Sequence, residues 1–117
     1  MLVKDTRKPY APMPEKPEGA QWAEPAKVIT RLRYRYDGEG YLPEGHHQLF
    51  VIPADGGSAR QLTSGPFDHR SVPDWAPDSK ALVLSANRHV DSDYQPLNNE
   101  VFELRLEDRS MKQLTNR

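Results

Sequence analysis

Histidines and carboxylates that lie close together in the sequence are the residues best able to hold a metal ion or move a proton. His46 and His47 are adjacent, Asp68 and His69 are adjacent, and Glu44 lies just before the first pair. Imidazole nitrogens and carboxylate oxygens are common ligands of transition metals. Neighbouring residues of an extended segment point to opposite sides, however, so both members of the first pair rarely reach one ion. The spacing therefore favours a polar loop over a metal site.

A Ser-His-Asp triad would need a serine in addition to Asp68 and His69. In α/β-hydrolases that serine stands in a G-x-S-x-G turn between a strand and a helix. Ser58 follows two glycines but has no glycine two positions later, and the other serines also lack this context. We therefore predict no catalytic, cofactor-binding or metal-ligating residue, and no enzymatic activity of the chain by itself. The seven serines are Ser58, Ser64, Ser71, Ser79, Ser85, Ser92 and Ser110.

Composition excludes several other functional classes. The 117 residues include 16 Lys and Arg against 17 Asp and Glu, a net charge of −1, and no cysteine. Although Arg31, Arg33 and Arg35 alternate along one segment, this balance argues against nucleic-acid binding by phosphate neutralisation. The lack of cysteine excludes disulfides, thiolate metal sites and cysteine nucleophiles. No apolar run approaches the roughly 18 residues of a membrane span, and both a cytoplasmic and a periplasmic location fit the composition.

Two kinds of segment must position these side chains. Residues 1–27 hold five of the eleven prolines, and proline fixes φ and removes an amide donor, so we expect a proline-rich arm or linker there. From Val28 to Tyr36 apolar and polar residues alternate, as in a strand with one exposed face. No window shows helical periodicity, and the sequence therefore predicts an all-β protein. Strands are expected near residues 28–36, 48–52, 59–63, 71–75, 80–86, 100–106 and 111–115.

An internal repeat organises these strands. Gln61-Leu62-Thr63 recurs 52 residues later as Gln113-Leu114-Thr115, and the same offset aligns Phe50 with Phe102. A repeat of about 40–50 residues with about four short strands is typical of a propeller blade. We therefore expect a partial β-propeller of about two four-stranded antiparallel blades: an incomplete one over residues 28–65 and a second over residues 66–117. The structural repeat positions are Phe50, Gln61, Leu62, Thr63, Trp75, Pro77, Asp78, Phe102, Gln113, Leu114 and Thr115.

One turn in the second repeat resembles a known family. Trp75-Ala76-Pro77-Asp78-Ser79-Lys80 is similar to the W-S-P-D-G-K turn of TolB-like propeller repeats, with Ala76 and Ser79 as departures that a type I turn tolerates. We expect Trp75 to anchor the packing between blades.

Other segments resemble the propeller domain of prolyl-oligopeptidase-family serine peptidases, nearest to the acylaminoacyl-peptidase and dipeptidyl-peptidase-like branch. These segments are residues 34–40, 48–57 and 60–63, and the resemblance as a whole extends over roughly residues 24–117. In that family a propeller screens peptide substrates for an α/β-hydrolase domain that carries a Ser-Asp-His triad.

The resemblance implies a non-catalytic propeller segment that gates or positions peptides for a hydrolase domain absent from this chain. The alternative is a TolB-like module that binds a protein partner and has no hydrolase attached. The implied partners are the remaining blades and hydrolase domain of a parent chain, or further copies of this chain joined through open strand edges, together with a peptide substrate. We expect no cofactor, nucleic acid or membrane as a partner.

Overall fold

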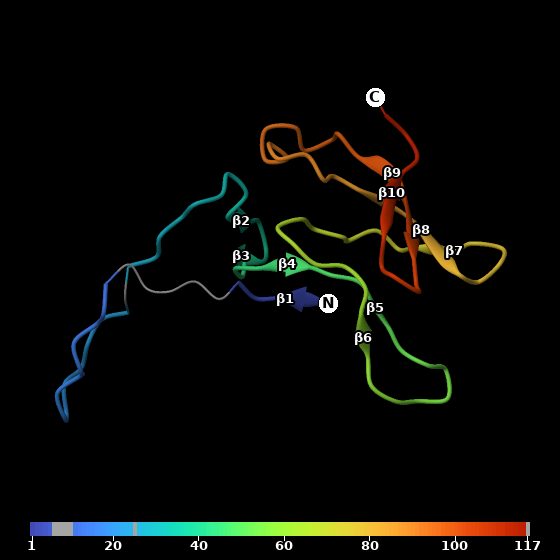
Figure 1. Cartoon of the computed structure of the whole chain (residues 1–117). Coiled ribbons are helices and arrows are strands. Elements are labelled where there is room, and N and C mark those ends of the chain that lie inside the picture. The colour runs from blue at the N-terminus through green and yellow to red at the C-terminus, as the bar shows by residue number, and fades with distance from the viewer. Residues whose placement is uncertain (6–10, 25, 117) are drawn as a thin grey trace.

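The structure is a computed structural model that describes residues 1–5, 11–24 and 26–116. All regular elements in these ranges are short β-strands, arranged in four antiparallel sheets. The all-β prediction is therefore confirmed, with one four-stranded and three two-stranded sheets (Figure 1). Within the described ranges there is no apolar helix of bilayer-spanning length.

The second predicted blade is a four-stranded antiparallel sheet with the strand order β10-β9-β8-β7. Its centre is the pairing of β8 with β9, which runs over six residues from Ala81 opposite Arg105 to Ala86 opposite Glu100. Side chains alternate between the two faces of a strand, and the buried residues of β8 and β9 alternate accordingly. The four strands are β7 (Asp74–Trp75), β8 (Ala81–Ala86), β9 (Glu100–Arg105) and β10 (Met111–Gln113).

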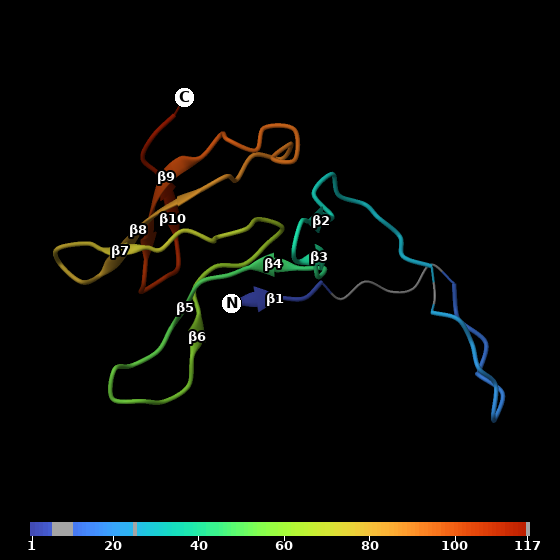
Figure 2. The same ribbon diagram turned by 180° about the vertical axis from the view of Figure 1, so that it is seen from behind.

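The first predicted blade is less complete and forms three two-stranded sheets. β5 pairs with β6, β2 pairs with β3, and β1 from the beginning of the chain pairs with β4. The β5–β6 hairpin lies beside the four-stranded sheet in both views (Figures 1 and 2). The six strands are β1 (Leu2–Val3), β2 (Arg35–Tyr36), β3 (Gly40–Tyr41), β4 (His46–His47), β5 (Phe50–Val51) and β6 (Arg60–Gln61).

Two sequence predictions for this first part need correction. The strand expected over residues 28–36 is reduced to β2, and Val28 and Leu32 are 52% and 57% exposed. The predicted arm is not entirely an arm either, because Leu2 lies opposite His47 in the β1–β4 pair. The alternation of residues 28–36 fits a strand, but a strand forms only where it can pair with the edge of another strand. β1 already pairs with part of the edge beside residues 46–48, so that part is not open to residues 28–36. Residues 11–24 do run away from the sheets as an exposed segment, while residues 6–10, 25 and 117 lie outside the described residues.

The core lies between the β5–β6 hairpin and the four-stranded sheet. Leu104 at its centre is 0% exposed, and Leu49, Val51 and Met111 pack around the buried cluster. Full burial of one such side chain stabilises a fold by roughly 1.5–3 kcal/mol, so this small cluster supplies a large part of the stability. Its members are Leu62, Leu82, Leu84, Ala86, Phe102 and Leu104.

Side-chain hydrogen bonds of two threonines reproduce the 52-residue repeat. The amide of Leu49 donates to Thr63 Oγ1 at 2.9 Å, and the amide of Val101 donates to Thr115 Oγ1 at 2.9 Å. The hydroxyl groups in turn donate to the residue before each amide, Gln48 in the first unit and Glu100 in the second. The repeat is therefore a structural unit and not only a similarity of letters.

The glutamine and the leucine of the repeat also occupy matching places. Gln61 and Gln113 each donate from Nε2 to the carbonyl oxygen of the threonine two residues later, at 2.7 Å in both units. The amides of Leu62 and Leu114 donate at 2.8 Å to the carbonyl oxygens of the equivalent residues Leu49 and Val101. The two leucines differ only in burial: Leu62 is 4% exposed and Leu114 is 47% exposed.

The turn between β7 and β8 shows the predicted type I hydrogen bond, from the amide of Ser79 to the carbonyl oxygen of Ala76 at 2.9 Å. Asp78 Oδ1 accepts the amide of Lys80 at 3.0 Å. Ser79 itself has a φ of 56°, in the left-handed region that favours glycine. Ser79, which stands where the similar TolB-like turn has glycine, is therefore strained, in contrast to the tolerance that the sequence suggested.

Replacement of Ser79 by glycine should raise the free energy of unfolding by about 0.5–1 kcal/mol. A side chain in the left-handed region has a steric cost of about 1–2 kcal/mol, which glycine removes. Glycine also loses more backbone entropy on folding, and this loss offsets part of the gain. Urea unfolding followed by tryptophan fluorescence measures the difference. Ser58→Gly is the matched control, because Ser58 is exposed and has no positive φ; equal destabilisation by both changes would contradict the left-handed turn.

Candidate functional site

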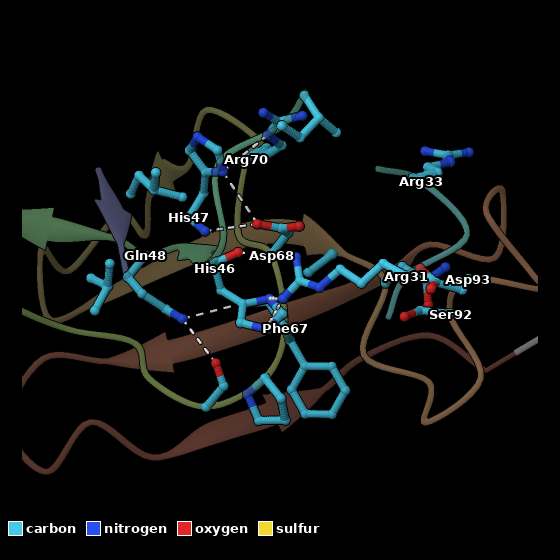
Figure 3. Close-up of a pocket in the computed structure, with 18 of the residues that line it drawn as sticks. Arg31, Arg33, His46, His47, Gln48, Phe67, Asp68, Arg70, Ser92 and Asp93 are labelled. Carbon is cyan, nitrogen blue, oxygen red and sulfur yellow. Dashed lines mark hydrogen bonds and ion pairs between the residues drawn. The ribbon is translucent and has the colours of Figure 1, made fainter. Parts of the chain in front are cut away.

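A cleft of about 1170 Å³ lies between the two units. Strands β1 and β4 form one wall, and residues 64–71 after β6 and residues 87–99 between β8 and β9 form others (Figure 3). Its lining carries charges of both signs beside apolar and aromatic side chains such as Leu2, Leu42 and Phe67. The ionisable groups discussed below are Asp5, Arg31, His46, His47, Asp68 and Arg70.

Asp68 and His47 form the first polar cluster in this cleft. The amide of His47 donates to Asp68 Oδ1 at 2.7 Å, and His47 Nδ1 lies 3.2 Å from the same oxygen. Arg70 Nε approaches that ring nitrogen at 3.2 Å. Burial alone would raise the pKa of Asp68, but the hydrogen bonds from the backbone and ring of His47 outweigh it and lower that pKa. Asp68 is therefore a carboxylate that holds β4 in place.

His46 belongs to a second cluster on the other side of β4. Arg31 Nη2 lies 2.6 Å from His46 Nε2 and 3.6 Å from Asp5 Oδ2, and Arg31 Nη1 donates to the carbonyl oxygen of Gly45 at 3.1 Å. Burial, followed by the charge of Arg31, lowers the pKa of His46. The imidazole is therefore neutral at physiological pH and accepts from the guanidinium.

The metal-site candidates considered in the sequence do not come together. His46 turns towards Arg31 and His47 turns towards Asp68, as alternation along a strand requires (Figure 3). No group of three histidine or carboxylate side chains suited to a metal ion occurs in the part of the chain that the structure describes.

His69 takes part in a buried polar network between the two units. It is 3% exposed, and its Nδ1 donates to Gln48 Oε1 at 3.1 Å. The same oxygen accepts the hydroxyl of Thr63 at 2.6 Å. Gln48 Nε2 donates to the carbonyl oxygens of Gly65 and Phe67 at 3.0 and 3.3 Å. All polar atoms of the Gln48 side chain are therefore bonded, as burial requires.

Arg88, from the loop after β8, completes this network. Its Nη1 donates to His69 Nε2 at 2.7 Å, which leaves the histidine proton on Nδ1. Its guanidinium lies 4.7 Å from the ring centre of Phe67 and 5.9 Å from that of Phe102, within range of cation–π attraction. Burial, followed by the charge of Arg88, lowers the pKa of His69.

These contacts separate the two residues of the hypothetical triad. The Asp68 carboxylate bonds to His47, whereas the His69 ring bonds to Gln48 and Arg88. Sequence reasoning did not find Arg88, because it lies in a segment that reads only as a polar loop. Its partners Phe67 and Phe102 are 35 residues apart in the sequence, so no local pattern marks the contact.

Of the repeat positions, Leu62 and Phe102 lie in the core between the two units, whereas Pro77 and Asp78 lie in the turn between β7 and β8. Trp75 is 55% exposed and lies outside the core cluster. Trp75 therefore does not pack between these two units, and its role as an anchor between blades stays a prediction. Its strand, β7, is the edge of the sheet, and pairs only with β8 at Leu82.

A comparison with known proteins relates the chain to peptidases. The protein named Uncharacterized peptidase YuxL, from Bacillus subtilis (strain 168), is 39% identical to this chain over 64 residues. The match covers 55% of this chain and 9% of that protein. The chain thus spans less than a tenth of this relative's length, and is similar to part of a peptidase. No protein-family model matches the sequence, and no solved structure matches it.

The lowered pKa values of His69 and His46 predict that the fold loses stability as the pH falls. The unfolded histidines take up protons near their ordinary pKa of 6.5, whereas the folded ones do so only at lower pH. Stability is therefore fully present above pH 6.5 and declines below it, by at most about 1.4 kcal/mol per pH unit for each histidine.

Urea unfolding at several pH values between 5 and 8 measures this decline. His69→Asn keeps an amide donor for Gln48 but cannot titrate, so its decline should be shallower than that of the unmodified protein. Asp68 does not contribute to the decline between pH 5 and 8. Because its pKa is lowered in the folded protein, it affects the free energy of unfolding only near and below its ordinary pKa of 3.8. Identical pH dependence in the two proteins would show that His69 is not held neutral.

Proposed function

We propose that this chain is a non-catalytic β-propeller segment of a prolyl-oligopeptidase-type serine peptidase. It would gate or position peptide substrates for an α/β-hydrolase domain that is absent from this chain. The similarity to part of a peptidase supports the class of protein. The W-A-P-D-S-K turn at Trp75 and the 52-residue repeat support the propeller assignment within that class.

One observation carries the proposal: the matching hydrogen bonds of the two units. A propeller blade repeats its strands with the same turn and the same side-chain bonds, and successive blades cover each other's faces. Thr63 and Thr115 accept equivalent amides at the same distance, and the β5–β6 hairpin covers one face of the next sheet. This arrangement supports consecutive blades over a set of unrelated hairpins.

The bonding of His69, which lies in the buried network beside the cleft, supports a role without catalysis. A general base needs a ring nitrogen that can reach the proton of a nucleophile. Both nitrogens of His69 are bonded, one to Gln48 and one to Arg88, and no serine stands in a nucleophile turn. The cleft can still bind a peptide, because its charged side chains and strand edges offer both donors and acceptors of hydrogen bonds.

The second candidate is a TolB-like module that binds a protein partner through its rim, with no hydrolase attached. The turn at Trp75 favours this candidate, because it resembles the turn of TolB-like propeller repeats, whereas the peptidase resemblance rests on other segments. The coding sequence downstream of Arg117 separates the two: a G-x-S-x-G motif after further blades supports the peptidase, and its absence there supports the binding module.

A serine-reactive fluorophosphonate probe tests the claim that the chain has no catalytic serine. Incubation of the purified chain with the probe, followed by intact-mass measurement, should leave the mass unchanged. A known serine peptidase in the same tube is the positive control. Stoichiometric labelling at one of the seven serines, lost when His69 is replaced by alanine, would show a catalytic centre in this chain and contradict the proposal.

A further inference from the structure

The outward face of the four-stranded sheet repeats the side chains that join the two units. Within the chain, Leu49 and Leu62 of the β5–β6 hairpin pack against the sheet. At the equivalent places of the second unit stand Val101 and Leu114, linked by the same backbone hydrogen bond of 2.8 Å. These two side chains point away from the core, and Leu114 is 47% exposed. Val101 and Leu114 on the outward face of the sheet are thus equivalent to Leu49 and Leu62, which the hairpin packs into the core.

The surface that could receive this pair also exists in the chain. Leu49 and Leu62 pack on a face that contains Phe102 and Leu104. The 52-residue offset places Phe50 and Ile52 at the corresponding positions of β5 and the residue after it. Neither belongs to the core cluster or to the residues packed against it, and Ile52 is 59% exposed. Phe50 is half-buried, so the back of the β5–β6 hairpin is a second apolar face that is partly exposed.

The charges around the outward pair do not oppose a contact. Glu103 lies directly opposite Lys112 on this face, and Arg105 Nε is 3.5 Å from Glu103 Oε1. The ion pair of Glu103 with Arg105 is partly exposed at the rim of the apolar patch and therefore costs little when a neighbour approaches.

We propose that this chain associates head to tail with a second copy of itself. Val101 and Leu114 of one protomer pack against Phe50 and Ile52 of the next, and so repeat between protomers the contact that joins the two units within each. The contact is heterologous, because the two faces differ, and it can therefore propagate or close into a ring. The inference rests on the internal repeat and does not require the peptidase role.

A symmetric dimer is the alternative use of the same residues. It would place Leu114 against Leu114, a contact that the chain does not contain between its own units. The head-to-tail contact has such an internal counterpart, in the packing of Leu62 on the face of Phe102 and Leu104.

Sedimentation velocity over a range of concentrations tests this association. The unmodified chain should sediment faster as its concentration rises. Leu114→Asp and Ile52→Asp should each weaken self-association at least about tenfold, because each places an unpaired charge in the apolar contact. Val90→Asp is the control: Val90 is 100% exposed, lies on neither face, and its replacement should change nothing.

An equimolar mixture of the Leu114→Asp and Ile52→Asp proteins distinguishes the two modes of contact. Each variant retains the face that the other lacks, so the mixture should form a dimer that grows no further. This recovery also shows that both variants are folded. A symmetric contact through Leu114 would give no recovery, and would leave Ile52→Asp associated.

Three outcomes would overturn the inference. The first is an unmodified chain that stays monomeric at its highest soluble concentration. The second is association that persists in both aspartate variants, and the third is a mixture that stays monomeric although each variant keeps the circular dichroism spectrum of the unmodified protein. None of these outcomes bears on the serine labelling experiment, so the proposed function stands or fails separately.

Discussion

A short twisted sheet cannot cover its own apolar face, and this constraint governs the whole structure. The four-stranded sheet has Leu82, Leu84, Phe102 and Leu104 on one side, and the β5–β6 hairpin covers them with Leu49 and Leu62. A six-membered buried cluster is small for a chain of 117 residues, so the stability of each unit depends on its neighbour. The exposed arm of residues 11–24 and the sparsely paired residues 28–34 contribute nothing to this cluster.

Polar contacts at the same junction determine which arrangement of the two units is stable. Gln48, His69 and Arg88 come from three separate segments and bond in sequence at 3.1 and 2.7 Å. Apolar side chains tolerate small displacements of one sheet over the other, whereas a buried hydrogen-bond network is complete in only one arrangement. The leucines thus hold the units together and the polar groups fix their orientation. Burial at this junction, followed by the charge of Arg88, lowers the pKa of His69, and the neutral ring can accept from Arg88.

The sequence predicted those parts of the fold that local pattern and repetition determine. The all-β class and the strands of the second unit follow from alternation and turn residues. The two copies of Gln-Leu-Thr mark equivalent positions that the hydrogen bonds reproduce. The fate of residues 28–36 was not predictable, because the competition of β1 for a strand edge depends on contacts distant in sequence. The strain at Ser79 could not be predicted either, because it depends on the φ angle of that residue. The pairing of His69 with Arg88 was not predictable because no sequence motif links the two positions.

The pairing of Met1 with Gln48 has a practical consequence for work with this protein. The amino group of Met1 donates to the carbonyl oxygen of Gln48 at 2.8 Å, and the amide of Gln48 donates back to Met1 at 2.7 Å. Since β1 runs antiparallel to β4, residues joined to that amino group continue alongside Leu49 and Phe50. An affinity tag fused there would therefore begin beside the β5 edge, at the place that β8 takes beside β9.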